Sequence, residues 1–170
     1  MFDQLAPRYD LTNRVISLGL DQWWRKQAIA ALGPAARGEV LDLCAGTLDF
    51  SLALIKGGAQ VQAVDFSERM LAVGRERLPD GARVHTITAD ARELPLPDDS
   101  VDGAVCGFGL RNVPEVERAL AECARVIRPG GRLVVLEFFV PTRPGARLLR
   151  RCLRPAWARR LPAPPPRAET

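Results

Sequence analysis

The sequence of 170 residues is poor in the side chains that build metal sites, because it has one histidine and four cysteines and no CxxC pair. Protein metal sites usually draw on clusters of such side chains at short spacings. We therefore expect no metal site, and we interpret the cysteines as free thiols of a protein in a reducing compartment. The cysteines are Cys44, Cys106, Cys123 and Cys152.

Long hydrophobic runs are also absent, and none approaches the ~18 residues that a membrane-spanning helix requires. The first residues, Met1 to Gln4, lack the basic and apolar segments of a secretory signal. These absences predict a soluble, cytoplasmic protein. The hydrophobic fraction of 47% is ordinary for one domain with a sizeable core.

Acidic residues are scarce at the C-terminal end, where the chain from Arg143 onward has eight arginines and one acid, Glu169. Residues 146–160 have the spacing of a basic amphipathic helix that includes Trp157, and such a helix can lie on an anionic bilayer. Solvated surface charge is the alternative interpretation. The arginines lack interleaved stacking aromatics, so we expect no nucleic-acid partner. Residues 161–170 are rich in proline and predict a disordered tail.

Strand and helix patterns alternate through the middle of the chain, which is typical of an α/β fold with a Rossmann-like parallel sheet and helices on both faces. We expect strand order 3-2-1-4-5 with right-handed crossovers, preceded by an N-terminal helical extension over residues 1–33. The predicted core spans 38–140. Its predicted strands are 39–43, 59–65, 83–88, 101–106 and 133–140, and its predicted helices are 48–56, 67–78 and 114–127.

In this strand order the topological switch point lies between the first and fourth strands. Ligands of open α/β sheets bind at the carboxyl ends of the strands at such a point. We therefore expect a ligand over Asp42 to Thr47 and over Cys106 to Arg111.

The turn after the first strand contains one glycine, Gly46, and an acid, Asp65, follows nineteen positions later at the end of the second strand. An acid at this position can accept hydrogen bonds from ribose hydroxyls, which indicates an adenosine-bearing ligand. A pyrophosphate-binding turn would have three glycines, but Leu48 and Asp49 stand where small residues are needed. The pattern thus favours a phosphate-free cofactor, S-adenosylmethionine, over a nicotinamide dinucleotide.

Each part of that cofactor has a candidate partner. Asp42 or nearby carbonyls are predicted to meet its ammonium group, and Asp65 its ribose. Asp42 has an alternative interpretation as a strand-end acid that caps a loop, and Asp65 as an acid at a helix N-terminus. The remaining predicted cofactor-binding residues are Ala45, Gly46 and Thr47 for the carboxylate, Asp90 and Ala91 for the adenine, and Phe66 and Gly107 beside them.

Several segments carry a more specific signal. FDQLAPRYDLTN (2–13), VLDLCAGTLD (40–49), LPLPDDSVD (94–102), FGLRNV (108–113) and RVIRPGGRLVVLEF (125–138) closely resemble the ubiquinone/menaquinone biosynthesis C-methyltransferase family. The resemblance covers about residues 2–140 and implies a class I S-adenosylmethionine-dependent methyltransferase domain over residues 1–145. It also implies methyl transfer to a ring carbon of a prenylated quinol, either demethylmenaquinol or the benzoquinol precursor of ubiquinone.

The resemblance further implies roles for three residues. Arg111 would stabilise a phenolate or orient a water that acts as a base, and Asn112 would hold that water. Tyr9 would close over the cofactor from the N-terminal helices, with residues 1–33 acting as a lid. The alternatives are an arginine paired with a carboxylate of the protein body and a tyrosine packed within a helical lid.

The sequence also departs from the family pattern. Ala45 and Leu48 replace glycines of the turn, which predicts a bulkier cofactor loop, and Gly107 stands where serine is common. The two usual terminal strands are expected to be missing. Strand 133–140 would then be an apolar sheet edge, which we expect to be covered by the basic tail or paired with another chain in a homodimer. Methylation of another small acceptor, or a cofactor-binding remnant with little activity, are the alternative functions.

Overall fold

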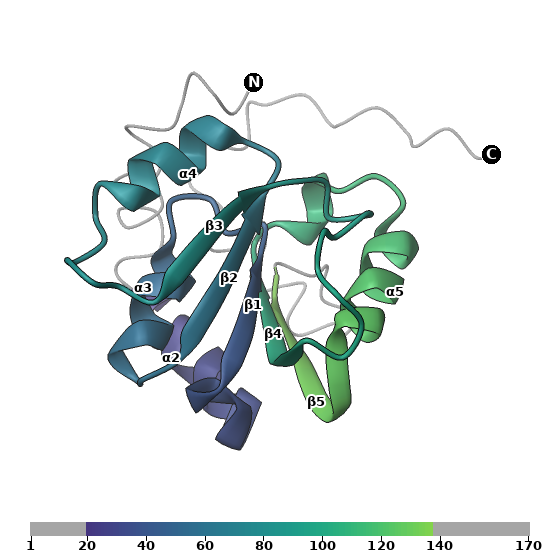
Figure 1. The fold of residues 1–170 in the computed structure, drawn as a ribbon, viewed down its shortest axis with the longest axis horizontal. Coiled ribbons are helices and arrows are strands. Elements are labelled where there is room, and N and C mark those ends of the chain that lie inside the picture. Colours follow the sequence, from purple (N-terminus) through teal and green to yellow (C-terminus); the bar gives the residue numbers. More distant parts are fainter. Residues whose placement is uncertain (1–19, 138–170) are drawn as a thin grey trace, which may run out of the picture. The chain divides into compact units, whose positions relative to one another are not determined.

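The centre of the fold is a parallel five-stranded sheet in the order β3-β2-β1-β4-β5 (Figure 1). Its coordinates are a computed structural model, which describes residues 20–137. The chain divides into two units, Met1–Glu137 and Phe138–Thr170, and the described residues belong to the first. The strands are β1 (Glu39–Leu43), β2 (Gln60–Asp65), β3 (Val84–Thr88), β4 (Val101–Gly107) and β5 (Ile127–Leu136).

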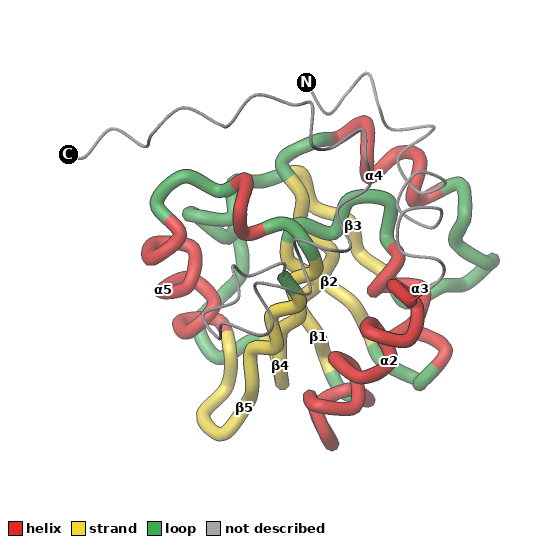
Figure 2. Tube along the Cα trace, turned by 180° about the vertical axis from the view of Figure 1, so that it is seen from behind, coloured by secondary structure: helices red, strands yellow, loops and turns green. Residues whose placement is uncertain are grey.

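Helices cover both faces of this sheet (Figure 2). Helices α2, α3 and α4 lie on one side, and α5 lies on the other. Their bounds are α2 (Leu20–Leu32), α3 (Asp49–Lys56), α4 (Glu68–Arg75) and α5 (Val116–Val126), with short 3-10 helices η2 (Gly33–Arg37) and η3 (Leu110–Asn112).

The alternation of side chains along the strands sorts the core into two layers, because successive residues of a strand point to opposite faces. On one face, Val40 and Val105 pack with Leu54 of α3. On the other, Leu41 and Leu43 pack with residues of α5 and of the loop before β4. Strands β1, β2 and β4 therefore contribute buried residues, whereas β3 and β5 contain none. The first strand is buried on both faces, as its apolar residues Val40, Leu41 and Leu43 predict.

The strand order and the parallel sheet predicted from the sequence are confirmed. The largest difference in a boundary is at β5, which begins at Ile127, whereas the prediction began it at residue 133. Val101 pairs with Ile127 but Gly103 pairs with Arg132, so four residues bulge out between two paired segments. Pro129 cannot donate a ladder hydrogen bond and Gly130 has φ +85°, so the bulge forms where the backbone favours it.

Some predictions concern parts of the chain outside the described residues. These are the lid before residue 20 with Tyr9, the end of the fifth strand at residues 138–140, the basic helix and the tail. Within residues 20–137, β5 pairs with β4 and with no further strand. No helix in that range is long and apolar enough to cross a membrane.

Candidate functional site

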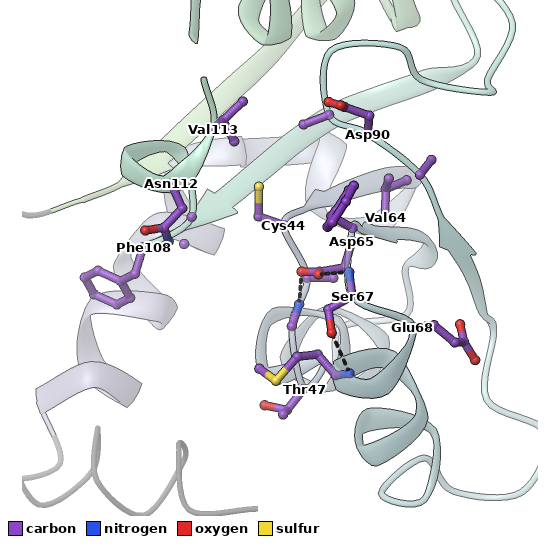
Figure 3. Close-up of a pocket in the computed structure, with 18 of the residues that line it drawn as sticks. Cys44, Thr47, Val64, Asp65, Ser67, Glu68, Asp90, Phe108, Asn112 and Val113 are labelled. Carbon is purple, nitrogen blue, oxygen red and sulfur yellow. Dashed lines mark hydrogen bonds between the residues drawn. The ribbon is translucent and has the colours of Figure 1, made fainter. Parts of the chain in front are cut away.

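A pocket of about 940 Å³ lies at the carboxyl ends of β1, β2 and β4. It is the position that the switch point predicts. Four segments form most of its wall: the turn 44–47, the end of β2 with the start of α4, the loop 89–92 and the stretch 107–114 (Figure 3). Of the predicted cofactor-binding residues, Ala45, Gly46, Thr47, Asp65, Phe66, Asp90, Ala91 and Gly107 line it.

The turn between β1 and α3 has left-handed backbone at Cys44, Gly46 and Leu48, with φ values of 55°, 54° and 66°. Leu48 nevertheless does not narrow the pocket. Its side chain is completely buried, and it packs against the bare α-carbon of Gly74 in α4. The expectation of a bulkier cofactor loop is therefore wrong for Leu48, because the turn directs this large side chain into the core, whereas Ala45 does line the pocket.

Asp65 ties this turn to the next helix. Its Oδ2 accepts a hydrogen bond from the Gly46 backbone N–H at 2.8 Å, and its Oδ1 accepts one from the Ser67 N–H at 2.8 Å. Burial raises the pKa of this carboxyl, while these backbone hydrogen bonds act in the opposite direction. Ser67 in turn caps α4 by accepting from Met70 N–H. The acid thus sits with fixed geometry at the wall of the pocket, beside Phe66, whose side chain is 81% exposed.

Asp42 is not among the residues that line the pocket, and its contact with the ligand stays a prediction. Its Oδ2 accepts hydrogen bonds from the backbone N–H of Ser51 at 2.9 Å and from the Ser51 hydroxyl at 2.7 Å. Ser51 lies in the first turn of α3, so Asp42 caps the helix from the strand below it, in agreement with the alternative interpretation. Burial raises its pKa to about 7.

Asp90 lies at the wall of the pocket and is held by Arg92. Its Oδ1 accepts from the Arg92 backbone N–H at 2.9 Å, and its Oδ2 accepts from Arg92 Nη2 at 2.7 Å. These hydrogen bonds lower the pKa of Asp90 to about 2, so the group is an anion at neutral pH. Arg92 also reaches Glu115 before α5, with Nη1 2.6 Å from Oε1. Asp90 and its neighbour Ala91 thus present a fixed acceptor and a small apolar surface.

Of the three predicted catalytic residues, the structure describes two, Asn112 and Arg111, and they differ in their relation to the pocket. Asn112 lines the pocket, and Figure 3 shows it beside Phe108, across from Asp65. Arg111 does not line the pocket. Its guanidinium lies 5.9 Å from the centre of the Phe108 ring and forms an ion pair with the nearly buried Glu137, as the alternative interpretation expected. Tyr9 lies outside the described residues.

Sequence reasoning missed Arg25, which lines the pocket from α2. Its Nη2 lies 3.1 Å from Asp49 Oδ2, and its guanidinium lies 5.2 Å from the Phe50 ring centre and 6.0 Å from that of Phe108. The available signal was an arginine beside two tryptophans in the helical extension predicted over residues 1–33. Helical periodicity alone could not show that this arginine faces a ligand site formed by residues 44–114.

The thiols of Cys44, Cys106 and Cys123 are free, as predicted for these three. Cys44 lines the pocket, and a hydrogen bond with Cys106 together with burial raises the pKa of its thiol far above the usual range. Burial raises the pKa of Cys123 to about 12. Within residues 20–137 no three metal-ligating side chains converge on one point. The polar groups of the pocket are therefore carboxylates, arginines, backbone amides, the hydroxyls of Thr47 and Ser67 and the amide of Asn112, and the Cys44 thiol is protonated.

A parallel sheet of this order, with a pocket at its switch point and an acid at the end of β2, defines a Rossmann-like α/β ligand-binding protein. The solved structure of an S-adenosylmethionine dependent methyltransferase from Mesorhizobium loti is similar, with a TM-score of 0.58 and 33% sequence identity. The matched region covers 64% of this chain and 51% of the Mesorhizobium loti chain.

The chain matches the ubiE/COQ5 methyltransferase family over residues 1–152, and it belongs to that family. It is 49% identical to the demethylmenaquinone methyltransferase of Clavibacter sepedonicus over 144 residues, which are 85% of this chain and 59% of the relative. It is 51% identical over 142 residues to the enzyme of the same name from Mycolicibacterium paratuberculosis, with 84% of this chain and 60% of the relative covered. The chain thus spans about three fifths of the length of these curated relatives.

Proposed function

We propose that this protein binds S-adenosylmethionine in the pocket and methylates a ring carbon of demethylmenaquinol. The observation that carries the proposal is the family match over residues 1–152, with relatives named demethylmenaquinone methyltransferase at about half identity. Those names favour a naphthoquinol acceptor over the benzoquinol precursor of ubiquinone.

The pocket fits the cofactor in the chemistry of its donors and acceptors. The Asp65 carboxylate has lone pairs left after its two backbone hydrogen bonds, and these can accept from ribose hydroxyls. The Phe66 ring, which is 81% exposed at the pocket, offers an apolar face for adenine. Gly46 has no side chain to fill the space above the turn, and only a methyl carbon of Met70 comes within 4 Å of the position of its missing β-carbon.

When it is bound, S-adenosylmethionine supplies an electrophilic methyl group. The protein has to hold the acceptor ring in line with it and to favour the phenolate form of that ring. Asn112, whose side chain lies in the pocket, is suited to position the ring or a water. Arg111 stands one residue before it, beside Phe108, and would act on the phenolate after leaving its ion pair with Glu137.

The protein is further proposed to be cytoplasmic and membrane-peripheral, since a prenylated quinol resides in the bilayer. The eight arginines from Arg143 onward support this proposal through their attraction to anionic lipids. Pairing of the fifth strand with a second chain is a companion proposal, supported by the apolar sequence 133–140, of which residues 133–136 form the end of β5 at the edge of the described sheet. Sedimentation of the chain with and without anionic vesicles tests both proposals.

The function is tested in two stages. Titration calorimetry with S-adenosylhomocysteine measures cofactor binding, and absence of binding would contradict the whole proposal. Transfer of a labelled methyl group to short-chain demethylmenaquinol and to the matching benzoquinol then measures activity. We expect methylation of the naphthoquinol in preference to the benzoquinol. Methylation of the benzoquinol alone, or cofactor binding without transfer to either quinol, would contradict the proposed substrate.

A further inference from the structure

Arg25 is a cation built into the wall of the pocket. It belongs to α2, which precedes the sheet, and its side chain is only 13% exposed. The rings of Phe50 and Phe108 lie 5.2 Å and 6.0 Å from its guanidinium carbon. Gly107 at the end of β4 contributes to this arrangement, because a β-carbon there would lie 2.9 Å from Phe50 Cδ2 and 3.7 Å from Arg25 Nη1. The absence of a side chain at Gly107 thus leaves the space that the arginine and the ring occupy.

The donors of Arg25 are only partly used within residues 20–137. Nη2 pairs with Asp49 Oδ2 at 3.1 Å, and Asp49 is shared, since its Oδ1 also accepts from Arg77 Nη2 at 2.7 Å. Arg25 Nε is buried and has no hydrogen-bond partner among the described residues, because its nearest carboxylate oxygen, Asp21 Oδ2, is 4.0 Å away. A buried donor without an acceptor carries a free-energy cost that a bound anion would remove.

The two flanks of the pocket differ in charge. Asp65 and Asp90, the acceptors suited to an adenosine moiety, stand on one flank, and Figure 3 shows Phe108 and Asn112 on the other, with Cys44 between them. Arg25 contacts Phe108 and therefore belongs to this second flank. A ligand that places its nucleoside beside Asp65 extends its other end toward a guanidinium group.

We infer that Arg25 binds the carboxylate of the amino-acid moiety of S-adenosylmethionine. The inference rests on the proposed function and adds to it a residue that recognises the end of the cofactor opposite the adenine. A guanidinium group on two aromatic rings is fixed in orientation and can donate two parallel hydrogen bonds to a carboxylate. Arg25 would then discriminate S-adenosylmethionine and S-adenosylhomocysteine from adenosine derivatives that lack the amino acid.

Titration calorimetry on the full chain tests this role with two ligands. S-Adenosylhomocysteine carries the amino-acid moiety, and 5′-methylthioadenosine keeps the nucleoside without it. We expect Arg25→Met to weaken binding of S-adenosylhomocysteine at least about tenfold, and that of 5′-methylthioadenosine by less than about twofold. Arg25→Lys keeps the charge but not the paired donors, so it should lose less affinity for S-adenosylhomocysteine than Arg25→Met does, and again little for 5′-methylthioadenosine. It serves as the test if Arg25→Met does not fold.

Arg128→Met is the matched control, because it removes a guanidinium group that pairs with Asp102, and neither residue lines the pocket. The control should change the affinities for S-adenosylhomocysteine and 5′-methylthioadenosine by the same factor. Equal losses for both ligands in the Arg25 variants, or no loss, would overturn the role of Arg25 while leaving the proposed function intact. A wild-type chain that binds neither ligand would instead refute the proposed function, and with it this inference.

Discussion

The large side chain of Leu48 occupies the space that a side chain on Gly74 would need. Leu48, in a left-handed backbone conformation, is completely buried, and a β-carbon on Gly74 would lie 2.9 Å from Leu48 Cδ1 and 2.9 Å from the carbonyl carbon of Thr47. The pair allows a leucine in the turn at the pocket without obstructing it.

Gly74→Ala should therefore destabilise the protein by about 1–3 kcal/mol through overpacking. The sign is informative, because alanine in place of glycine inside a helix otherwise stabilises by roughly 0.5–1 kcal/mol. Urea unfolding measures the change. Adding Leu48→Ala creates the missing room, so the double variant should be more stable than the sum of the two single changes predicts. Additive effects would show that the two side chains do not compete for space.

Asp65→Asn should weaken binding of S-adenosylhomocysteine by about 10- to 100-fold, since it removes a charged acceptor and one of the two backbone hydrogen bonds at 2.8 Å. Calorimetry measures the loss. Asp98→Asn is a matched control, because its side chain is 74% exposed and pairs with Arg125 away from the pocket. The control should stay within about twofold of wild type, and a similar loss in both variants would argue against a binding role for Asp65.

Asp42 should make stability depend on pH. Burial raises its pKa from the usual 3.8 to about 7, so between these values the folded protein binds more protons than the unfolded chain. The stability that Asp42 contributes is therefore fully present below pH 3.8 and is lost as the pH rises through 7, with a loss of up to about 4 kcal/mol.

Asp42→Asn cannot ionise, and its side-chain oxygen can still accept from the N–H and hydroxyl of Ser51. The free energy of unfolding, measured at pH 5 and at pH 8, should fall less between these values in the variant than in wild type. Parallel pH profiles would mean that Asp42 titrates normally. Both proteins share the other carboxylates, so the contributions of these groups to the pH dependence of unfolding largely cancel in the comparison.

Arg111→Ala should slow methyl transfer without a comparable loss of cofactor affinity, because Arg111 lies outside the wall of the pocket. We expect the dissociation constant of S-adenosylhomocysteine to stay within about threefold, and the turnover of demethylmenaquinol to fall by about 10²-fold or more, the usual range for loss of acid–base assistance. Glu137→Gln breaks the same ion pair but keeps the arginine, so it should retain far more activity. A large loss of affinity in Arg111→Ala would place this residue in cofactor binding.

Local patterns in the sequence predicted most of the fold. The apolar runs of β1 and β4, the glycine and proline breaks between elements, and the alternation of strand and helix were sufficient for the strand order, since parallel crossovers leave few topologies. The bulge before Arg132 was not predicted, because it depends on which residues of β4 and β5 pair.

The sequence by itself also determined the position of the pocket, through the strand order, one glycine turn and one acid nineteen residues later. Only the tertiary structure decided which side chains reach that site. Asp42 and Asp65 both stand at or near strand ends and on the same face of the sheet, since Asp42 pairs with Ala63, yet Asp42 is buried under α3 and Asp65 lies at the pocket. Arg25 and Gly107 are 82 positions apart, and only the packing of α2 on the sheet brings them together. Orientation and long-range contact arise from packing, which residue order along the chain does not specify.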